Sequence, residues 1–141
     1  MELFVYGTLL FPEVLGALLD RVPPRVPATA CGWRVAALPG RVYPGLVPDR
    51  RRVAGGMVLS GLTRAECRLL DDYEDTDGQD YQLREIALAG GRSCPAYVWR
   101  TAVLPHDWDP RGFAAEHLAD YVRQCARWRV TTGRRPPGTD R

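Results

Sequence analysis

The first part of the chain combines a strand-like apolar run with a helix-like apolar stripe. Residues 3–6 (Leu-Phe-Val-Tyr) form a short continuous apolar run of the kind found in buried strands, and Gly7 follows where the backbone must change direction. Pro12 suits the first turn of a helix, and Pro23 with Pro24 prevents its continuation. The apolar residues that share one face of this helix are Val14, Leu15, Leu18 and Leu19. The pattern predicts a strand, a loop and a helix.

The middle of the chain predicts two strands followed by a helix. Residues 28–38 alternate in hydrophobicity, residues 53–59 form a second apolar stretch, and a turn-rich segment around Pro44 separates them. Thr63 and Glu66 then form a capping box, in which each side chain can satisfy the backbone N–H group of the other residue. We expect a helix from this box to about Tyr73, followed by an acidic loop over residues 74–80.

The remaining elements are a hairpin and an amphipathic helix. Residues 81–89 and 93–99 flank Gly90-Gly91, a dipeptide that readily forms a tight hairpin turn, so these two strands should pair. Apolar positions recur at helical spacing over residues 113–129, which predicts a final helix packed on the sheet. Those positions are Ala114, Leu118, Tyr121, Val122 and Cys125.

These elements predict one α+β domain over residues 1–130. Five or six strands with about three helices that do not alternate regularly with them favour a small, curled, mixed β-barrel with flanking helices. Residues 131–141 contain no apolar side chain that could anchor them to a core, and we expect a flexible C-terminal tail.

Charge argues against a nucleic-acid or membrane partner. The 141 residues carry a net charge of +2, and the arginines, which supply every one of the 19 basic side chains, are spread along the chain rather than clustered. The nearest approach to a basic patch is residues 50–52, which we interpret as a solvated loop. No apolar run reaches the roughly 20 residues needed to span a bilayer, and residues 1–6 lack the basic start of a signal peptide. We expect a cytoplasmic protein.

Metal and cofactor sites are not encoded in any local motif. The four cysteines are about thirty residues apart with no C-x-x-C pair, and we interpret them as small buried apolar residues. His106 and His117 have no partner at metal-ligand spacing, although a Cys–His nucleophile pair stays open. The segment before Gly78 resembles a calcium loop, but Tyr73 and Arg84 then stand where carboxylates are required. We expect neither a metal nor a cofactor.

Two features could carry chemistry. Residues 6–9 (Tyr-Gly-Thr-Leu) lead from a strand toward a helix, where successive backbone N–H groups can hold an anion such as a carboxylate; a plain tight turn is the alternative. Glu74 follows a well-capped helix beside Asp71, Asp72 and Asp75, where the helix dipole and like charges should raise the pKa of its carboxyl group. A solvated acidic helix end is the alternative there.

Five short segments together resemble the gamma-glutamyl cyclotransferase family of AIG2-like proteins. They are residues 6–9 at the N-terminus, Tyr43-Pro44-Gly45, Val53-x-Gly55, Leu70-Asp71-x-Tyr73-Glu74 and Ala96-Tyr97-Val98-Trp99, in the family's order and spacing. The resemblance covers roughly residues 1–100, and the C-terminal helix is similar to the extension in AIG2-like members. It implies a curled barrel fold, which agrees with the elements predicted above.

The resemblance also implies particular site residues. Tyr6, Gly7, Thr8 and Leu9 would bind the α-carboxylate end of a γ-glutamyl substrate, and Glu74 would be the acid/base residue. Tyr81 would contact the substrate as well. The family usually places an arginine two residues after this tyrosine, whereas here Arg84 is three residues after it, so the roles of Tyr81 and Arg84 are open.

The function that these residues imply is a cofactor-independent γ-glutamyl cyclotransferase. Glu74 would move a proton while the substrate's α-amine attacks its own γ-carbonyl, releasing 5-oxoproline and a free amine or amino acid. Either a backbone N–H near Gly7 or a tyrosine hydroxyl could stabilise the oxyanion. The alternatives are a non-catalytic binding module for a carboxylated metabolite or protein partner, and a pathway-specific enzyme that removes a γ-glutamyl protecting group. Neither the leaving amine nor the oligomeric state follows from the sequence.

Overall fold

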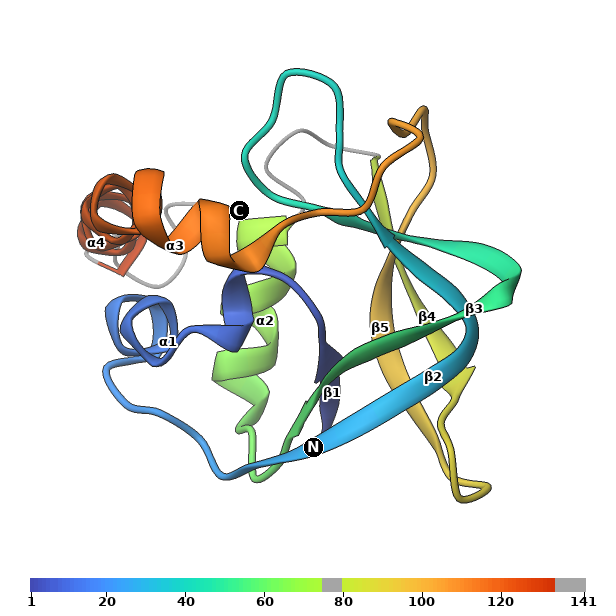
Figure 1. Cartoon of the computed structure of the whole chain (residues 1–141). Helices are drawn as coiled ribbons and strands as arrows, with labels where there is room; N and C mark the ends of the chain where they lie inside the picture. Colours follow the sequence, from blue (N-terminus) through green and yellow to red (C-terminus); the bar gives the residue numbers. More distant parts are fainter. Residues whose placement is uncertain (75–79, 134–141) are drawn as a thin grey trace.

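The computed structural model describes residues 1–74 and 80–133 (Figure 1). The predicted acidic loop falls largely on residues 75–79 and most of the predicted tail on residues 134–141, so both expectations lie outside the described residues. The division at residue 130 stays a prediction. In chain order the elements are β1 (Leu3–Val5), a 3-10 turn η1 (Thr8–Leu10), α1 (Pro12–Leu19), β2 (Arg25–Ala36), β3 (Gly45–Leu59), α2 (Arg64–Glu74), β4 (Tyr81–Ala87), β5 (Ser93–Trp99), α3 (Pro110–Glu116) and α4 (Leu118–Gly133).

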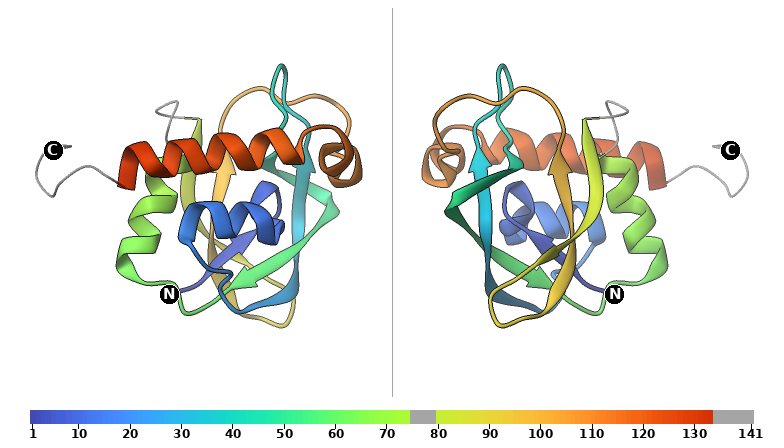
Figure 2. Two further views of the ribbon diagram at one scale, coloured as in Figure 1. Left: turned by 90° about the vertical axis from the view of Figure 1, so that its left-hand side faces the viewer. Right: turned by 90° about the vertical axis from the view of Figure 1, so that its right-hand side faces the viewer.

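The five strands form one mixed sheet in the order β2-β3-β1-β5-β4. Strand β1 pairs antiparallel with β3 and parallel with β5, and β4 and β5 form the antiparallel hairpin predicted around Gly90-Gly91. The long strand β3 also pairs with β5 where Leu46 meets Val98, which curls the sheet without closing it. Figures 1 and 2 show the helices gathered against one side of this curl. The α+β class with a curled mixed sheet is therefore confirmed.

Strand β3 is twice as long as the sequence pattern predicted. It begins at Gly45 rather than Val53, because residues 45–59 pair with β2 along nearly their whole length, with a bulge between Cys31 and Trp33. The prediction that residues 50–52 form a loop was wrong: these arginines lie within β3, and their side chains are exposed. The N-terminal half of β3 gives no apolar strand pattern, because one face of a two-stranded ribbon at the sheet edge is exposed to solvent and carries polar residues.

Strand β1 separates two apolar clusters. Leu3 and Val5 face the helices and pack with the apolar face of α1, whose Val14, Leu15, Leu18 and Leu19 are all buried as predicted. Phe4 and Tyr6 point the other way, into the inside of the curled sheet. This alternation follows from the two-residue period of a strand. The 6–9 loop thus leaves the sheet at the boundary between the two clusters.

The ends of the helices use specific side chains. The capping box of α2 is confirmed: the Thr63 hydroxyl accepts from the Glu66 N–H at 3.0 Å, and the Glu66 carboxylate accepts from the Thr63 N–H at 3.0 Å. At the C-terminal end of α1, Arg129 of α4 donates to the Leu18 carbonyl at 2.8 Å and pairs with Asp20 at 3.1 Å. This contact ties α4 to α1.

The predicted final helix is two helices, and they do not pack mainly on the sheet. Helix α3 begins at Pro110 under an Asp109 cap, and His117 departs from helical geometry before α4 starts. The break allows Phe113 to pack on Phe11 at 5.4 Å between ring centres while α4 lies along α1.

The expectation that the cysteines are buried is wrong for Cys31, which is exposed, whereas Cys94 and Cys125 are buried.

Candidate active site

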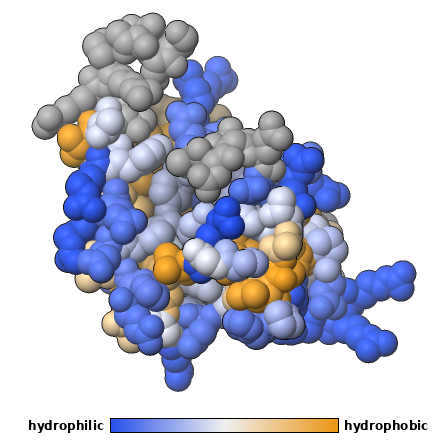
Figure 3. All heavy atoms as spheres, turned by 90° about the horizontal axis from the view of Figure 1, so that it is seen from above, coloured by the Kyte–Doolittle hydropathy of each residue, from blue (hydrophilic) through white to orange (hydrophobic). Residues whose placement is uncertain are grey.

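A pocket of about 280 Å³ opens where the 6–9 loop, the end of α2, the starts of β3 and β4, the end of β5 and α4 meet. All six tyrosines of the chain line it, although they come from six different segments. The lining residues are Phe4, Val5, Tyr6, Gly7, Thr8, Leu9, Tyr43, Pro44, Tyr73, Glu74, Asp80, Tyr81, Tyr97, Trp99, Tyr121, Gln124, Cys125 and Trp128. Seen from above (Figure 3), pale and orange residues lie between strongly hydrophilic borders on this side of the molecule. Aromatic walls with a few polar groups are typical of a small-molecule site.

The 6–9 loop is held against the start of β3 by close packing at glycine. A Cβ atom on Gly7 would lie 2.7 Å from the Pro44 side chain, so a larger residue cannot occupy this position without displacing the proline. Gly7 has φ −126° and ψ −127°, so its φ lies outside the left-handed region, and the reason for glycine that the packing shows is close approach. The loop continues into η1, where the first N–H groups of the turn have no acceptor within it. These groups could serve a ligand.

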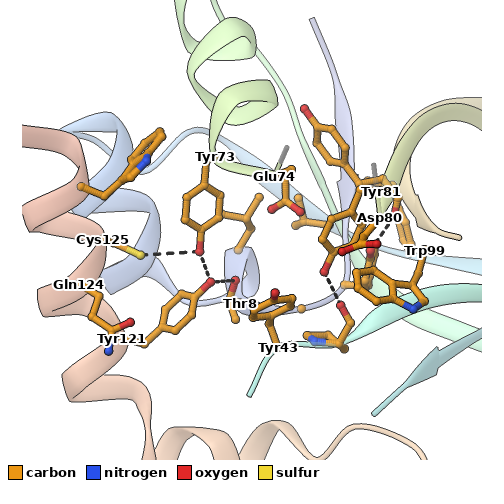
Figure 4. A pocket seen from close by; sticks show the side chains of 18 residues that line it. Thr8, Tyr43, Tyr73, Glu74, Asp80, Tyr81, Trp99, Tyr121, Gln124 and Cys125 are labelled. Atoms are coloured by element: carbon orange, nitrogen blue, oxygen red, sulfur yellow. Dashed lines mark hydrogen bonds between the residues drawn. The ribbon is translucent and has the colours of Figure 1, made fainter. Parts of the chain in front are cut away.

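Glu74 is the last residue of α2, and its carboxyl group faces the pocket (Figure 4). Burial raises the pKa of the Glu74 carboxyl group from its ordinary value to about 8. The direction was predicted, but its cause differs, because desolvation accounts for it rather than the helix dipole and the aspartates. Among the described residues, the Glu74 carboxyl group has no hydrogen-bond or ion-pair partner. It is available to a ligand in the pocket.

Two tyrosine hydroxyl groups already donate their protons to backbone carbonyls. Tyr81 donates to the Pro44 carbonyl at 2.7 Å, and Tyr6 donates to the Tyr97 carbonyl at 2.5 Å. Burial raises the pKa of both phenols well above the ordinary value, so both stay neutral at physiological pH. These two hydroxyl groups hold the pocket walls together. The Tyr6 oxygen also receives a backbone hydrogen bond from Leu46, whereas the Tyr81 oxygen can still accept a hydrogen bond from a ligand.

A second group of hydroxyls lies on the α4 side of the pocket. The Thr8 hydroxyl donates to the Tyr121 hydroxyl at 3.4 Å, and the Tyr121 and Tyr73 hydroxyls are hydrogen-bonded to each other. The Cys125 thiol donates to the Tyr73 hydroxyl at 3.7 Å. In Figure 4 this group lies on one side of Glu74, and Tyr81, Asp80 and Trp99 lie on the other.

The opposite side of the pocket is aromatic. The Tyr81 ring packs edge-on against Trp99, with 5.0 Å between ring centres, and Arg41 lies over the Trp99 ring at 5.2 Å. Arg41 also pairs with Asp80 at 3.5 Å. None of the described lining residues is a lysine, arginine or histidine, so the polar groups that these side chains offer to a ligand are hydroxyls, a thiol, an amide, an indole N–H and carboxylates.

The structure brings together every site residue expected from the sequence: Tyr6, Gly7, Thr8, Leu9, Glu74 and Tyr81 all line the pocket. Their roles stay predictions. Arg84 does not line it; this residue lies on β4 with an exposed side chain. Neither histidine lines it, so the Cys–His nucleophile pair finds no support there.

Sequence reasoning gave no site role to Tyr121, Trp128 or Gln124. Tyr121 was counted among the apolar packing positions of the predicted final helix, and Gln124 and Trp128 were given no role. The position of α4 depends on contacts with α1 that no local pattern shows. A partial signal was present in the motifs, because Tyr6, Tyr43, Tyr73 and Tyr97 all lie within the family-like segments, whereas Tyr81 and Tyr121 do not.

Two classes of site find no support in the described chain. No group of three or more histidine, cysteine or acidic side chains in residues 1–74 and 80–133 could hold a metal ion. Across the same residues, no helix combines the length and the apolar character that crossing a membrane requires.

The family described as “Gamma-glutamyl cyclotransferase, AIG2-like” matches residues 3–128. The chain is 36% identical over 127 residues to AIG2-like protein C of Arabidopsis thaliana, covering 86% of this chain and 73% of that protein. It is similar to an Arabidopsis thaliana protein solved in solution, with TM-score 0.65 and 27% identity over 97% of this chain and 86% of that one. A structure named gamma-glutamyl cyclotransferase shares the fold, with TM-score 0.59 and 14% identity over 89% and 85% of the two chains. The chain belongs to the gamma-glutamyl cyclotransferase, AIG2-like family.

Proposed function

We propose that this protein is a cofactor-independent γ-glutamyl cyclotransferase that releases 5-oxoproline from a γ-glutamyl amine or γ-glutamyl amino acid. Family membership supports cyclotransferase-like activity in general terms. The observation that carries the proposal is the Glu74 carboxyl group, which faces the pocket without a partner among the described residues and has a pKa of about 8. A general acid/base works best when its pKa lies near the working pH.

The reaction needs no external nucleophile. The substrate's α-amine attacks its γ-carbonyl carbon, which forms the C–N bond of a five-membered lactam, and the original amide C–N bond then breaks. Glu74 accepts the proton that the α-ammonium group loses and returns it to the departing nitrogen. 5-Oxoproline and the released amine together contain all the atoms of the substrate, so the reaction needs neither water nor a redox partner.

Glu74 must be ionised before it can accept a proton. With a pKa of about 8 the empty pocket holds Glu74 mostly protonated at neutral pH. A bound α-ammonium group brings a positive charge next to the carboxyl group and favours its ionised form. The substrate itself therefore helps to prepare the base.

The rest of the rate enhancement comes from holding the substrate folded. A γ-glutamyl chain must bend so that its α-nitrogen reaches the γ-carbon, and orientation of reacting groups can contribute about 7–11 kcal/mol in favourable cases. The backbone N–H groups of the 6–9 loop are suited to hold the α-carboxylate, and one of them can also meet the oxyanion. Tyr6 and Tyr81 are less suited to the oxyanion, because their protons are bound to carbonyls.

The test is 5-oxoproline release, detected by mass spectrometry, from a panel of γ-glutamyl amines, γ-glutamyl dipeptides and glutathione. Wild type and Glu74→Gln are assayed side by side. We expect product from the wild type with at least one class of substrate and little from the variant, and the preferred substrate identifies the leaving group. Equal turnover by both proteins, or no turnover by the wild type across the panel, would contradict the proposal.

A further inference from the structure

Thr8 is unusual in its surroundings. Only 6% of its surface is exposed, and it is the one polar residue in the buried set of the described chain. A buried hydroxyl group is costly unless it is hydrogen-bonded. Its partner is the Tyr121 hydroxyl, 113 residues away in the sequence. A valine would fill the same space without this requirement, so the hydroxyl calls for an explanation beyond packing.

Tyr121 supplies its hydroxyl from a helix that is already anchored by other contacts. Its ring packs edge-on against Phe113, with 5.3 Å between ring centres, and Arg129 ties the same helix to α1. The ring therefore belongs to the packing, whereas the hydroxyl group projects into the pocket (Figure 4). Burial raises the pKa of the Tyr121 phenol above its ordinary value, so the group stays neutral. Its oxygen accepts from Thr8, and in the arrangement in which Tyr73 donates to Tyr121 the Tyr121 proton stays available to a ligand, unlike the protons of Tyr6 and Tyr81.

The position of this hydroxyl pair suits one particular group of a γ-glutamyl substrate. The α-ammonium and α-carboxylate groups are attached to the same carbon, so the carboxylate site must lie next to the residue that serves the ammonium group. Thr8 belongs to the 6–9 loop, and Tyr121, its hydrogen-bond partner, is close enough to Glu74 for the charge of that carboxyl group to affect the Tyr121 phenol. The hydroxyl pair therefore lies near both the 6–9 loop and Glu74. No cationic residue lines the pocket among those described, so hydroxyl and amide donors are the groups available for a carboxylate.

We propose that the Thr8–Tyr121 hydroxyl pair binds the α-carboxylate of the substrate, which makes Tyr121 of the C-terminal helix a substrate-binding residue. The inference rests on the proposed cyclotransferase function. It extends the carboxylate site from one loop to two elements far apart in the sequence. It also gives α4 a role in the site besides covering α1.

The experiment compares two substrates that differ only at this group. One is the best γ-glutamyl amide from the panel, and the other is its γ-aminobutyryl analogue, which lacks the α-carboxylate and would cyclise to 2-pyrrolidinone. The variants are Tyr121→Phe, Thr8→Val and the double variant. Tyr43→Phe is the matched control, because it removes a hydroxyl group from another segment of the same pocket. The analogue is scored by turnover, or by its inhibition constant where turnover is too slow.

We expect Tyr121→Phe and Thr8→Val each to raise KM for the γ-glutamyl substrate about 10-fold or more, since hydrogen bonds to charged groups are strong, with kcat little changed. The double variant should lose less than the product of the two single effects, because the pair acts as a unit. The analogue should bind equally well to the wild type, the two single variants and the double variant. Tyr43→Phe should change the KM of the γ-glutamyl substrate and the binding constant of the analogue by the same factor.

Three outcomes would overturn the inference. An unchanged KM in Tyr121→Phe would show that the hydroxyl group contributes nothing to binding. An equal loss on both substrates would show that the role is structural, with no contact to the carboxylate. A wild type that releases no 5-oxoproline would overturn the proposed function and this inference together. If the wild type is active, the proposed function stands and the variants test the carboxylate site alone.

Discussion

Helix α2 has a glutamate near each end, and the two have opposite environments. Glu66, in the first turn, accepts hydrogen bonds from Arg21 at 2.6 and 2.7 Å, and together with the capping bond these lower its pKa to about 2. Glu74, in the last turn, has no such partner among the described residues, and burial raises its pKa to about 8. The same side chain on one helix is a hydrogen-bonded anion at one end and a buried carboxyl group with a raised pKa at the other.

The partners of each glutamate, rather than the residue type, set the difference between its two environments. The Glu66 carboxylate oxygens accept hydrogen bonds from Arg21 and from the Thr63 N–H, so they are occupied by partners within the protein. Glu74 faces a pocket that holds aromatic rings and hydroxyl groups, so its charge is costly until a cationic group arrives. Carboxyl groups whose pKa values are pushed apart by their surroundings are a recurrent mark of acid/base sites. The predictions below test each side of this contrast.

The largest expected effect is on turnover. Glu74→Gln should lower kcat for 5-oxoproline release about 10²–10⁴-fold, the usual range for loss of a general acid/base. Glu66→Gln is the matched control, since it makes the same change on the same helix, and its kcat should stay within about twofold of the wild type. Steady-state kinetics on purified proteins measures both. Equal losses in the two variants would show that the contrast between the ends of α2 has no catalytic meaning.

The pH dependence of turnover should follow the Glu74 carboxyl group. The base form is the ionised one, so kcat/KM should rise about tenfold per pH unit below pH 8 and level off above it, until the substrate's own ammonium group deprotonates. Glu74→Gln should lose this rise from its residual activity. A profile that is flat between pH 6 and pH 8 in the wild type would contradict the assignment of Glu74 as the base.

Stability should respond in opposite directions at the two positions. The folded-state pKa of Glu74 is raised, so the folded state binds more protons than the unfolded state between about pH 4.5 and 8, and the free energy of unfolding falls as pH rises through that window. Glu74→Gln should remove this fall and be roughly 1–3 kcal/mol more stable than the wild type at pH 8, with no difference near pH 4.

Glu66 has the opposite sign, because its folded-state pKa is lowered. Its contribution is present above about pH 4.5 and is lost as pH falls toward 2. Glu66→Gln should therefore lower the free energy of unfolding at pH 7 by about 1 kcal/mol. Urea denaturation at pH 4, 7 and 8 measures both variants. A shift of the same sign in the two variants at pH 8 would contradict the account.

The smallest expected effect is that of salt. The Arg21–Glu66 pair is partly exposed, so 1 M NaCl should reduce the stability difference between wild type and Glu66→Gln by a few tenths of a kcal/mol. The pH midpoint of kcat/KM should stay in place, because burial rather than a charged partner sets the pKa of Glu74. A pH midpoint of kcat/KM that shifts when 1 M NaCl is added would point to an ion pair at Glu74.

Local patterns in the sequence predict much of this fold. Glycine at the hairpin turn, the capping box of Thr63 and Glu66, and the apolar face of α1 each depend on neighbours within a few residues, and each is found in the structure. The N-terminal half of β3 depends on pairing with β2, so its polar residues give no local strand signal. The break at His117 likewise depends on where Phe113 and α4 pack.

The candidate site shows the same division. Glu74 and the 6–9 loop can be found from motif order, because each motif is short and contiguous. The sequence also gives the direction of the Glu74 pKa but not its cause, since desolvation depends on walls contributed by Tyr73, Tyr81 and their neighbours. Tyr121 is beyond local reasoning, because its hydroxyl meets Thr8 only after α4 has packed against α1.

Helix α2 thus holds two glutamates in opposite protonation environments. The most direct test is a carboxyl titration by NMR on protein labelled with ¹³C at the glutamate side-chain carboxyl, with Glu74→Gln and Glu66→Gln used to assign the two resonances. The account predicts a resonance, missing in Glu74→Gln, that titrates near pH 8, and another, missing in Glu66→Gln, that titrates near pH 2. A Glu74 midpoint near the ordinary glutamate value of about 4.3 would contradict it.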